Sequence, residues 1–173
     1  VHGRTPLMTA MLQTDQLPSE EVLELLLGLR TPNSNRNQVS PAKIPTEDTH
    51  QLPLHVAAEE LAHNFGLIST IYEAYPDAKK CPDIRGRTPL HLALGNYRSV
   101  VIDESLLELL FCESVCKMQD DDGRKPLDLV LKNPTCLKQG DSIIFQQFLD
   151  ASIDKSSSSD AASLLRQLRS LPP

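Results

Sequence analysis

Tryptophan is absent from the 173-residue sequence, and aromatic residues make up only 4% of it. β-Sandwiches and barrels build their cores from aromatic and β-branched strands, so this composition argues against both. The apolar residues, 40% of the chain, suit helix pairs that pack through Leu, Ile, Val and Ala. We therefore expect an all-α protein.

Long apolar runs are also missing. Residues 22–29 form one of the longest, and it is broken by Glu and far shorter than the roughly 20 residues that cross a bilayer. The N-terminus has no basic segment followed by an apolar core, which a signal peptide requires. The one Asn-x-Thr sequence, Asn133-Pro134-Thr135, is disqualified as a glycosylation site by its proline. We expect no membrane insertion and an intracellular, cytoplasmic location.

Basic residues do not cluster anywhere, and the formal net charge is −6. Nucleic-acid binding rests on a clustered basic face, so we expect no nucleic-acid partner. The cysteines at 81, 112, 116 and 136 form neither a C-x-x-C pair nor a disulfide framework. Cys112 and Cys116 would share one helix face, but two ligands are too few for a metal site, and core packing is the preferred interpretation.

Catalytic motifs are missing as well. The sequence has no Gly-rich phosphate loop, no G-x-S-x-G elbow, no H-E-x-x-H helix and no kinase signature. Residues 120–122, three consecutive aspartates, resemble half a cation site, but a solvated turn is the preferred interpretation. We predict no catalytic residue, no cofactor and no metal, so an enzyme active within these residues is the weakest hypothesis.

What the sequence does contain is an internal repeat. In the clearest copy, Thr88 can accept a hydrogen bond from an amide of the first helical turn, and Pro89 gives up an N–H that would have no partner. Each copy therefore predicts the start of a helix. The four copies are Gly3-Arg4-Thr5-Pro6-Leu7-Met8-Thr9-Ala10-Met11, His50-Gln51-Leu52-Pro53-Leu54-His55-Val56-Ala57-Ala58, Gly86-Arg87-Thr88-Pro89-Leu90-His91-Leu92-Ala93-Leu94 and Gly123-Arg124-Lys125-Pro126-Leu127-Asp128-Leu129-Val130-Leu131.

The sequence Thr88-Pro89-Leu90-His91-Leu92-Ala93 resembles the ankyrin-repeat signature. The resemblance covers roughly residues 1–150. It implies units that each consist of a β-turn finger and two antiparallel helices, stacked into a solenoid. It also implies a structural role for His55 and His91, because ankyrin repeats use histidine structurally at this position. Leu52 and Lys125 replace the capping Thr, so we expect those two helices to start without a side-chain cap.

The resemblance predicts an ankyrin-repeat domain, and the change of composition after Ile153 predicts a Ser-rich linker followed by a C-terminal amphipathic helix. The first two copies are 47 residues apart against a usual unit of about 33, and most of the excess falls in the loop at 31–48, which is either functional or disordered. The C-terminal helix would either cap the last repeat or dock elsewhere. The expected bounds are 1–153 for the repeat domain, with repeats at about 1–30, 48–80, 83–117 and 120–153, then 154–160 for the linker and 161–173 for the helix.

Second helices are predicted from apolar residues at helical spacing. Ser19 is the expected cap of the first, which ends near Gly28, and the next two cover 67–75 and 103–117. Their shared core should bury one set of residues at matching offsets, namely Leu26, Ile71, Leu107, Leu110 and Ile144.

The preferred function is a non-catalytic protein–protein interaction module or scaffold that acts as a monomer and binds another protein. The alternative is a regulatory or targeting ankyrin segment of a longer enzyme, channel or ubiquitin-ligase subunit. In ankyrin arrays the fingers and first helices form a concave groove, and Ile84 would be a large apolar residue on a finger tip. Carried over by register, the resemblance gives the partner-binding candidates Asp48, Thr49, Gln51, Glu59, Glu60, Ile84, Arg85, Arg87, Gly95, Asn96, Asp121, Asp122, Arg124, Lys132 and Asn133.

Overall fold

The computed structural model describes residues 3–12, 18–28, 40–95, 102–132 and 143–152. Within these ranges the chain is helical and has no strand, which confirms the prediction of an all-α protein. The helices are α1 (Pro6–Met11), α2 (Glu20–Leu26), α3 (Pro53–Glu60), α4 (Phe65–Ala74), α5 (Pro89–Gly95), α6 (Glu104–Leu110), α7 (Glu113–Cys116), α8 (Pro126–Lys132) and α9 (Ile143–Ser152), with short 3₁₀ turns η1 (Pro41–Lys43) and η2 (Pro76–Lys80).

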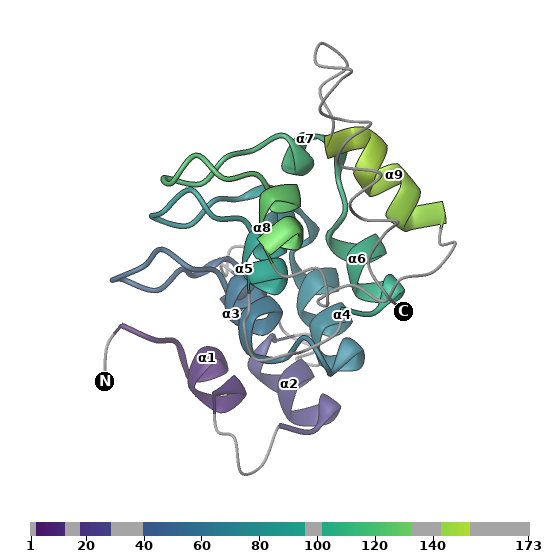
Figure 1. The fold of residues 1–173 in the computed structure, drawn as a ribbon. Helices are drawn as coiled ribbons and strands as arrows, with labels where there is room; N and C mark the ends of the chain where they lie inside the picture. Colours follow the sequence, from purple (N-terminus) through teal and green to yellow (C-terminus); the bar gives the residue numbers. More distant parts are fainter. Residues whose placement is uncertain (1–2, 13–17, 29–39, 96–101, 133–142, 153–173) are drawn as a thin grey trace.

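The helices form two rows (Figure 1). In the first row α1 packs against α3, α3 against α5, and α5 against α8; each of these helices begins at the proline of one sequence copy. In the second row α2 packs against α4, α4 against α6, and α6 against α9. The second row thus lies behind the first, and loops project from the opposite side of the first row (Figure 1).

Side chains near the starts of several helices satisfy local backbone groups. Thr5 accepts a hydrogen bond from the N–H of Met8 over 3.3 Å, and Ser19 accepts one from Val22 over 3.4 Å, which confirms the predicted cap at Ser19. Leu52 makes no side-chain cap, as predicted. Instead, Nδ1 of His55 accepts from the N–H of Leu52 over 3.1 Å, so the third residue of α3 reaches back to the residue before the helix.

The same back-bonding recurs in the next two first-row helices. Nδ1 of His91 accepts from the N–H of Thr88 over 3.2 Å and pairs with its hydroxyl over 2.8 Å. In α8 the carboxylate of Asp128 accepts from the N–H of Lys125 over 2.7 Å. Asp128 therefore makes, at the start of α8, the hydrogen bond that histidine makes at the starts of α3 and α5.

The core lies between the two rows and forms one continuous cluster that includes residues from α1 to α9. Ile71, Leu107 and Leu110 are buried as predicted, but Leu26 and Ile144 are only partly buried, so the prediction was wrong in degree for these two. Their neighbours on the same helices occupy the inward positions instead, and these are Leu23 and Leu27 beside Leu26, and Phe148 and Leu149 on the helix of Ile144.

The single helix predicted at 103–117 is wrong. Phe111 and Cys112 are extended, with ψ of 135° at both, and they separate α6 from α7. The break lets α7 turn so that Val115 and Cys116 are fully buried and α7 packs against α9. Cys112 stays partly exposed, so it does not share a helix face with Cys116, although the burial of Cys116 agrees with core packing.

Several predictions concern residues outside the described ranges. These are the linker at 154–160, the helix at 161–173, Cys136 and residues 31–39 of the long loop. Among the helices that the structure does describe, none combines the length and apolar character needed to span a bilayer.

Candidate binding groove

Three loops project side by side from the first row of helices (Figure 1), and we call residues 46–51, 83–87 and 120–124 the second, third and fourth fingers. Each is a tight hairpin. In the third finger the N–H of Asp83 donates to the carbonyl of Arg87 over 2.8 Å, and the N–H of Gly86 donates to the carbonyl of Asp83 over 3.0 Å. The fourth finger repeats both bonds with Asp120, Arg124 and Gly123.

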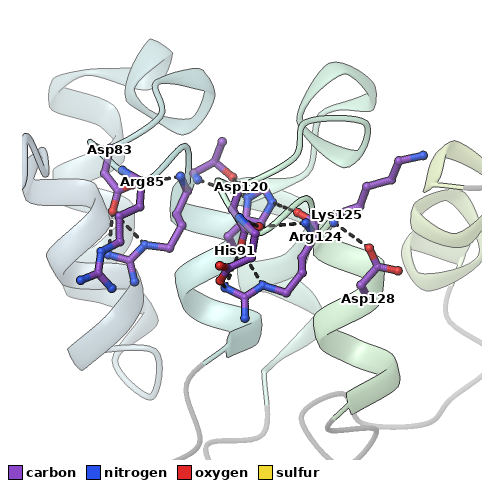
Figure 2. A network of polar contacts seen from close by, with 10 residues as sticks. Asp83, Arg85, His91, Asp120, Arg124, Lys125 and Asp128 are labelled. Carbon is purple, nitrogen blue, oxygen red and sulfur yellow. Dashed lines mark hydrogen bonds and ion pairs between the residues drawn. The ribbon is translucent and has the colours of Figure 1, made fainter.

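One carboxylate organises the third finger (Figure 2). Oδ1 of Asp83 accepts from the N–H groups of Arg85 and Arg87, each over 2.9 Å, and Oδ2 accepts from Nε and Nη2 of Arg87 over 3.0 and 2.7 Å. Burial by itself raises the pKa of Asp83, but the hydrogen bonds from Arg87 and Arg85 outweigh burial, so the pKa lies below its usual value. The ionised carboxylate therefore holds the finger closed.

Asp120 does the same in the fourth finger, where Oδ1 accepts from the N–H groups of Asp122 and Arg124 and Oδ2 from Nε of Arg124 over 2.9 Å. Its pKa is lowered for the same balance of reasons: burial raises it, and the bonds from Arg124 more than compensate. Asp120 is only 6% exposed. The interpretation of residues 120–122 as a solvated turn is therefore wrong for Asp120 and right for the exposed Asp121 and Asp122.

The second finger reaches the same closure with different residues. It is one residue longer, and Thr46 takes the place of the aspartate: its hydroxyl accepts from the N–H of Gln51 over 2.9 Å. His50 stands where the other fingers have glycine and adopts a positive φ of 53°, a left-handed conformation that is rare for residues other than Gly.

Backbone hydrogen bonds join the fingers to one another. The N–H of Ile84 donates to the carbonyl of Thr49 over 3.0 Å, and the N–H of Asp121 donates to the carbonyl of Arg85 over 2.9 Å. His91 adds a third link from α5, because its Nε2 lies 3.2 Å from the carbonyl oxygen of Arg124 (Figure 2). The fingers are thus fixed relative to each other.

Three hollows lie along the fingers and the first-row helices, and neighbouring hollows share wall residues. The first and second share Glu59, and the second and third share Arg87, Asp120 and Arg124. We call the three together the finger groove. The first hollow, of about 270 Å³, is lined by Arg4, Leu12, Thr46, Asp48, Thr49, Gln51, Val56, Glu59 and Glu60. The second, of about 260 Å³, adds His91, Leu92, Gly95 and Leu129 to the shared residues, and the third, of about 230 Å³, adds Arg85, Asp121 and Asp122.

Most of the candidate partner-binding residues line this groove. Ile84 and Lys132 are exposed but line none of the three hollows, and Asn96 and Asn133 lie outside the described residues. The candidates brought together are Asp48, Thr49, Gln51, Glu59 and Glu60 in the first hollow, Glu59, Arg87, Gly95 and Arg124 in the second, and Arg85, Arg87, Asp121, Asp122 and Arg124 in the third.

The sequence predictions missed part of the groove wall. Val56, Leu92 and Leu129 each follow the proline of their copy by three positions and each lines a hollow. The register of the repeat could have identified them. Arg4 and Thr46 carried no such signal, since one lies in the first, less typical copy and the other replaces an aspartate.

The two buried histidines stay neutral. Burial lowers the pKa of His55 to about 4, and the nearby Asp83 and the backbone around it offset this only in part. Burial lowers the pKa of His91 as well, against the opposing effects of the Arg124 carbonyl and Asp120. A neutral ring with Nδ1 engaged at the helix start serves the structure.

Glu59 lies where the first and second hollows meet. Burial raises the pKa of Glu59 most; Arg87 lowers it, the carboxylates of Glu60 and Asp83 raise it, and a hydrogen bond from Gln51 lowers it. Glu59 therefore lies close to charges of both signs.

No protein-family model matches the sequence, and no curated protein is similar enough to be counted as a relative. A proposal for the function therefore rests on the sequence repeat, the fold and the groove.

Proposed function

We propose that this chain is a non-catalytic protein-binding module of ankyrin-like repeats, and that it holds a partner protein in the finger groove. The observation that supports this most is the continuity of the groove: three fingers, joined by backbone hydrogen bonds, border hollows that share their walls. A groove made of repeated units is an extended surface, and extended surfaces of repeat proteins bind other chains.

The rigidity of the fingers favours binding. Each hairpin is closed internally by Asp83, Asp120 or Thr46, so little conformational entropy remains to be lost when a partner is bound. Polar groups that could accept or donate hydrogen bonds line the rim, and the second hollow offers the apolar side chains of Leu92 and Leu129. Such a mixture of polar and apolar groups is typical of non-obligate interfaces.

Ile84 offers a direct test, because its side chain is 55% exposed at a finger tip and no core contact accounts for it. Replacing it in Ile84→Ser should abolish capture of the partner that the wild-type chain retains from a lysate of its source cells. The matched control is Leu25→Ser, since Leu25 is similarly apolar and 63% exposed but lies on α2, in the second row. The control should capture the partner normally.

A second test reverses a charge on the third finger, and it should change Arg85 and leave Arg87 intact. Arg87 is bound to the buried carboxylate of Asp83, so its reversal would disrupt the finger and its surface together. Arg85→Glu should weaken capture while leaving the thermal midpoint within about 2 °C of the wild type. Normal capture by both Ile84→Ser and Arg85→Glu, or loss with Leu25→Ser alone, would place the interface away from the fingers.

A further inference from the structure

The finger groove is not uniform in charge. The third hollow holds as many arginines as aspartates, and two of those arginines already pair with carboxylates of the fingers: Arg87 with Asp83, and Arg124 with Asp120 and Asp122. The first hollow is different. Three carboxylates line it, those of Asp48, Glu59 and Glu60, against the single guanidinium of Arg4.

The walls of the first hollow suit one kind of side chain. Leu12 and Val56 form an apolar wall, while Thr46, Thr49 and Gln51 place polar groups at the finger side. A long cationic side chain has this same division, with an apolar stem and a charged head. The hollow, at about 270 Å³, is smaller than the roughly 300–1,000 Å³ of small-molecule sites, so it fits a single side chain better than a whole ligand.

The polar groups on the finger side are held in place. The hydroxyl groups of Thr46 and Thr49 lie 2.6 Å apart, and Thr49 donates to Oε1 of Gln51 over 3.1 Å. The second finger is also tied to the third through the bond from Ile84 to Thr49. This side of the hollow is therefore preformed.

A metal ion fits the hollow less well. Hard cations need several oxygen ligands converging at about 2.0–2.6 Å, and no group of three or more His, Cys, Asp or Glu side chains within the described part of the chain is arranged to hold one. Carboxylates that are spread around a partly apolar hollow match an organic cation, whose charge is distributed over several N–H groups.

We propose that the first hollow receives the cationic side chain, Arg or Lys, of an extended segment of the partner protein. This inference rests on the proposed function and specifies the chemistry of the partner. The stem lies against Leu12 and Val56, and the N–H groups of the head donate to the carboxylates of Asp48, Glu59 and Glu60. Burial and, to a smaller extent, the carboxylates of Glu60 and Asp83 raise the pKa of Glu59, and a cation held beside it would favour its ionised form.

The test uses a small probe and the chain itself. N-acetyl-arginine methylamide is titrated into the ¹⁵N-labelled chain, with N-acetyl-glutamate methylamide as the chemical control. We expect saturable shifts with the arginine probe at the amides of Asp48, Thr49, Gln51, Glu59 and Glu60, and none with the glutamate probe. Equal shifts with both probes, or arginine shifts spread over the surface, would overturn the inference.

Two sets of substitutions with opposite expected effects on the affinity for the arginine probe distinguish a change in binding from a loss of folding. Asp48→Asn with Glu60→Gln should weaken the arginine probe about fivefold. Arg4→Gln should strengthen it, because it removes the one guanidinium that lines the hollow and would repel an incoming cation. A matched control, Glu73→Gln with Glu108→Gln, changes the net charge equally at exposed positions outside the groove and should leave the affinity unchanged. A loss with the control equal to that with the hollow variant would show that only the overall charge matters and would overturn the inference.

The two proposals can fail separately. If Ile84→Ser abolishes partner capture but the arginine probe does not bind, the groove binds a partner through another chemistry. If the probe binds but Ile84→Ser captures normally, the hollow recognises a cation while the proposed protein interface is wrong.

Discussion

Nε2 of His91 lies 3.2 Å from the carbonyl oxygen of Arg124, so one ring joins α5 to the fourth finger. The ring's tautomer follows from its other nitrogen. The backbone N–H of Thr88 can only donate, so Nδ1 of His91 is the acceptor, the proton is on Nε2, and Nε2 donates to Arg124. His91 is 1% exposed.

Removing this ring should destabilise the chain. His91→Ala leaves the N–H of Thr88 and the carbonyl of Arg124 without this partner in a buried setting, which should cost about 1–3 kcal/mol of the free energy of unfolding. His63→Ala, at an exposed histidine, is the control and should change it by less than about 0.5 kcal/mol. Urea unfolding measures both, and equal effects would contradict the structural role of His91.

Stability should fall as the solution becomes mildly acidic. The unfolded chain protonates His55 near its usual pKa of 6.5, whereas burial lowers the pKa in the folded chain to about 4. The contribution of the neutral ring is therefore complete above pH 6.5 and is lost as the pH falls from 6.5 to about 4, by about 3 kcal/mol in total. Denaturant unfolding at pH 7, 5.5 and 4.5 measures the loss.

A variant that lacks a titratable side chain at position 55 tests whether His55 causes the loss of stability in acid. His55→Gln should lose less stability than the wild type between pH 7 and 4.5, whereas His63→Gln should follow the wild type. Asp83 and Asp120 do not interfere, because their lowered pKa values place their loss of charge at lower pH. An unchanged slope in His55→Gln would assign the acid sensitivity to other groups.

Alanine substitutions at two glycines test how closely the third and fourth fingers pack against each other. Gly86 and Gly123 have nearly the same φ, 72° and 73°, so alanine at either position costs about 1–2 kcal/mol for the left-handed conformation. A Cβ at Gly86 would in addition lie 3.2 Å from Cα of Asp120 and from the carbonyl oxygen of Gln119, whereas nothing lies within 4 Å of one at Gly123.

We therefore expect Gly86→Ala to cost about 1 kcal/mol more than Gly123→Ala. The difference in unfolding free energy between the two variants isolates the contact between neighbouring fingers, because the conformational cost cancels. Equal losses would mean that the fingers tolerate being pushed apart.

The largest loss of stability is expected for a substitution in the core between the two rows of helices. Leu110 is fully buried at the end of α6, so Leu110→Ala should cost about 2–5 kcal/mol. Leu25→Ala, at a position 63% exposed, should cost less than about 0.5 kcal/mol. Thermal or urea unfolding would refute the packing if the Leu110 variant changed stability by less than 0.5 kcal/mol.

The starts of the helices were predictable because they depend on local chemistry. A proline at the first helical position limits where the helix can begin, and α1, α3, α5 and α8 all begin at the expected proline. The break between α6 and α7 was not predictable in this way. Leu106, Leu107 and Leu110 follow helical spacing, and no proline or glycine marks the turn at Phe111, on the two sides of which α6 and α7 each pack against α9.

Most residues that line the groove could be predicted from their positions in the repeat, but the distribution of charge along the groove could not. The sequence predictions gave Asp83 no role and treated Asp120 as part of a solvated turn, although each precedes its proline by six residues and organises a finger. Their effect on Arg87 and Arg124 depends on distances that no sequence pattern contains. The acidic character of the first hollow depends on the fold, which brings Asp48 of the second finger to the same hollow as Glu59 and Glu60 of α3.

The most direct test of a binding groove is photo-crosslinking from its rim. A benzoyl-phenylalanine placed at position 84, on the third finger, should crosslink to the captured partner, and the same group at position 25, on α2, should not. Mass spectrometry of the products identifies the crosslinked partner peptide. Crosslinks from position 25 with none from position 84 would contradict the account, because the partner would then lie against the second row of helices.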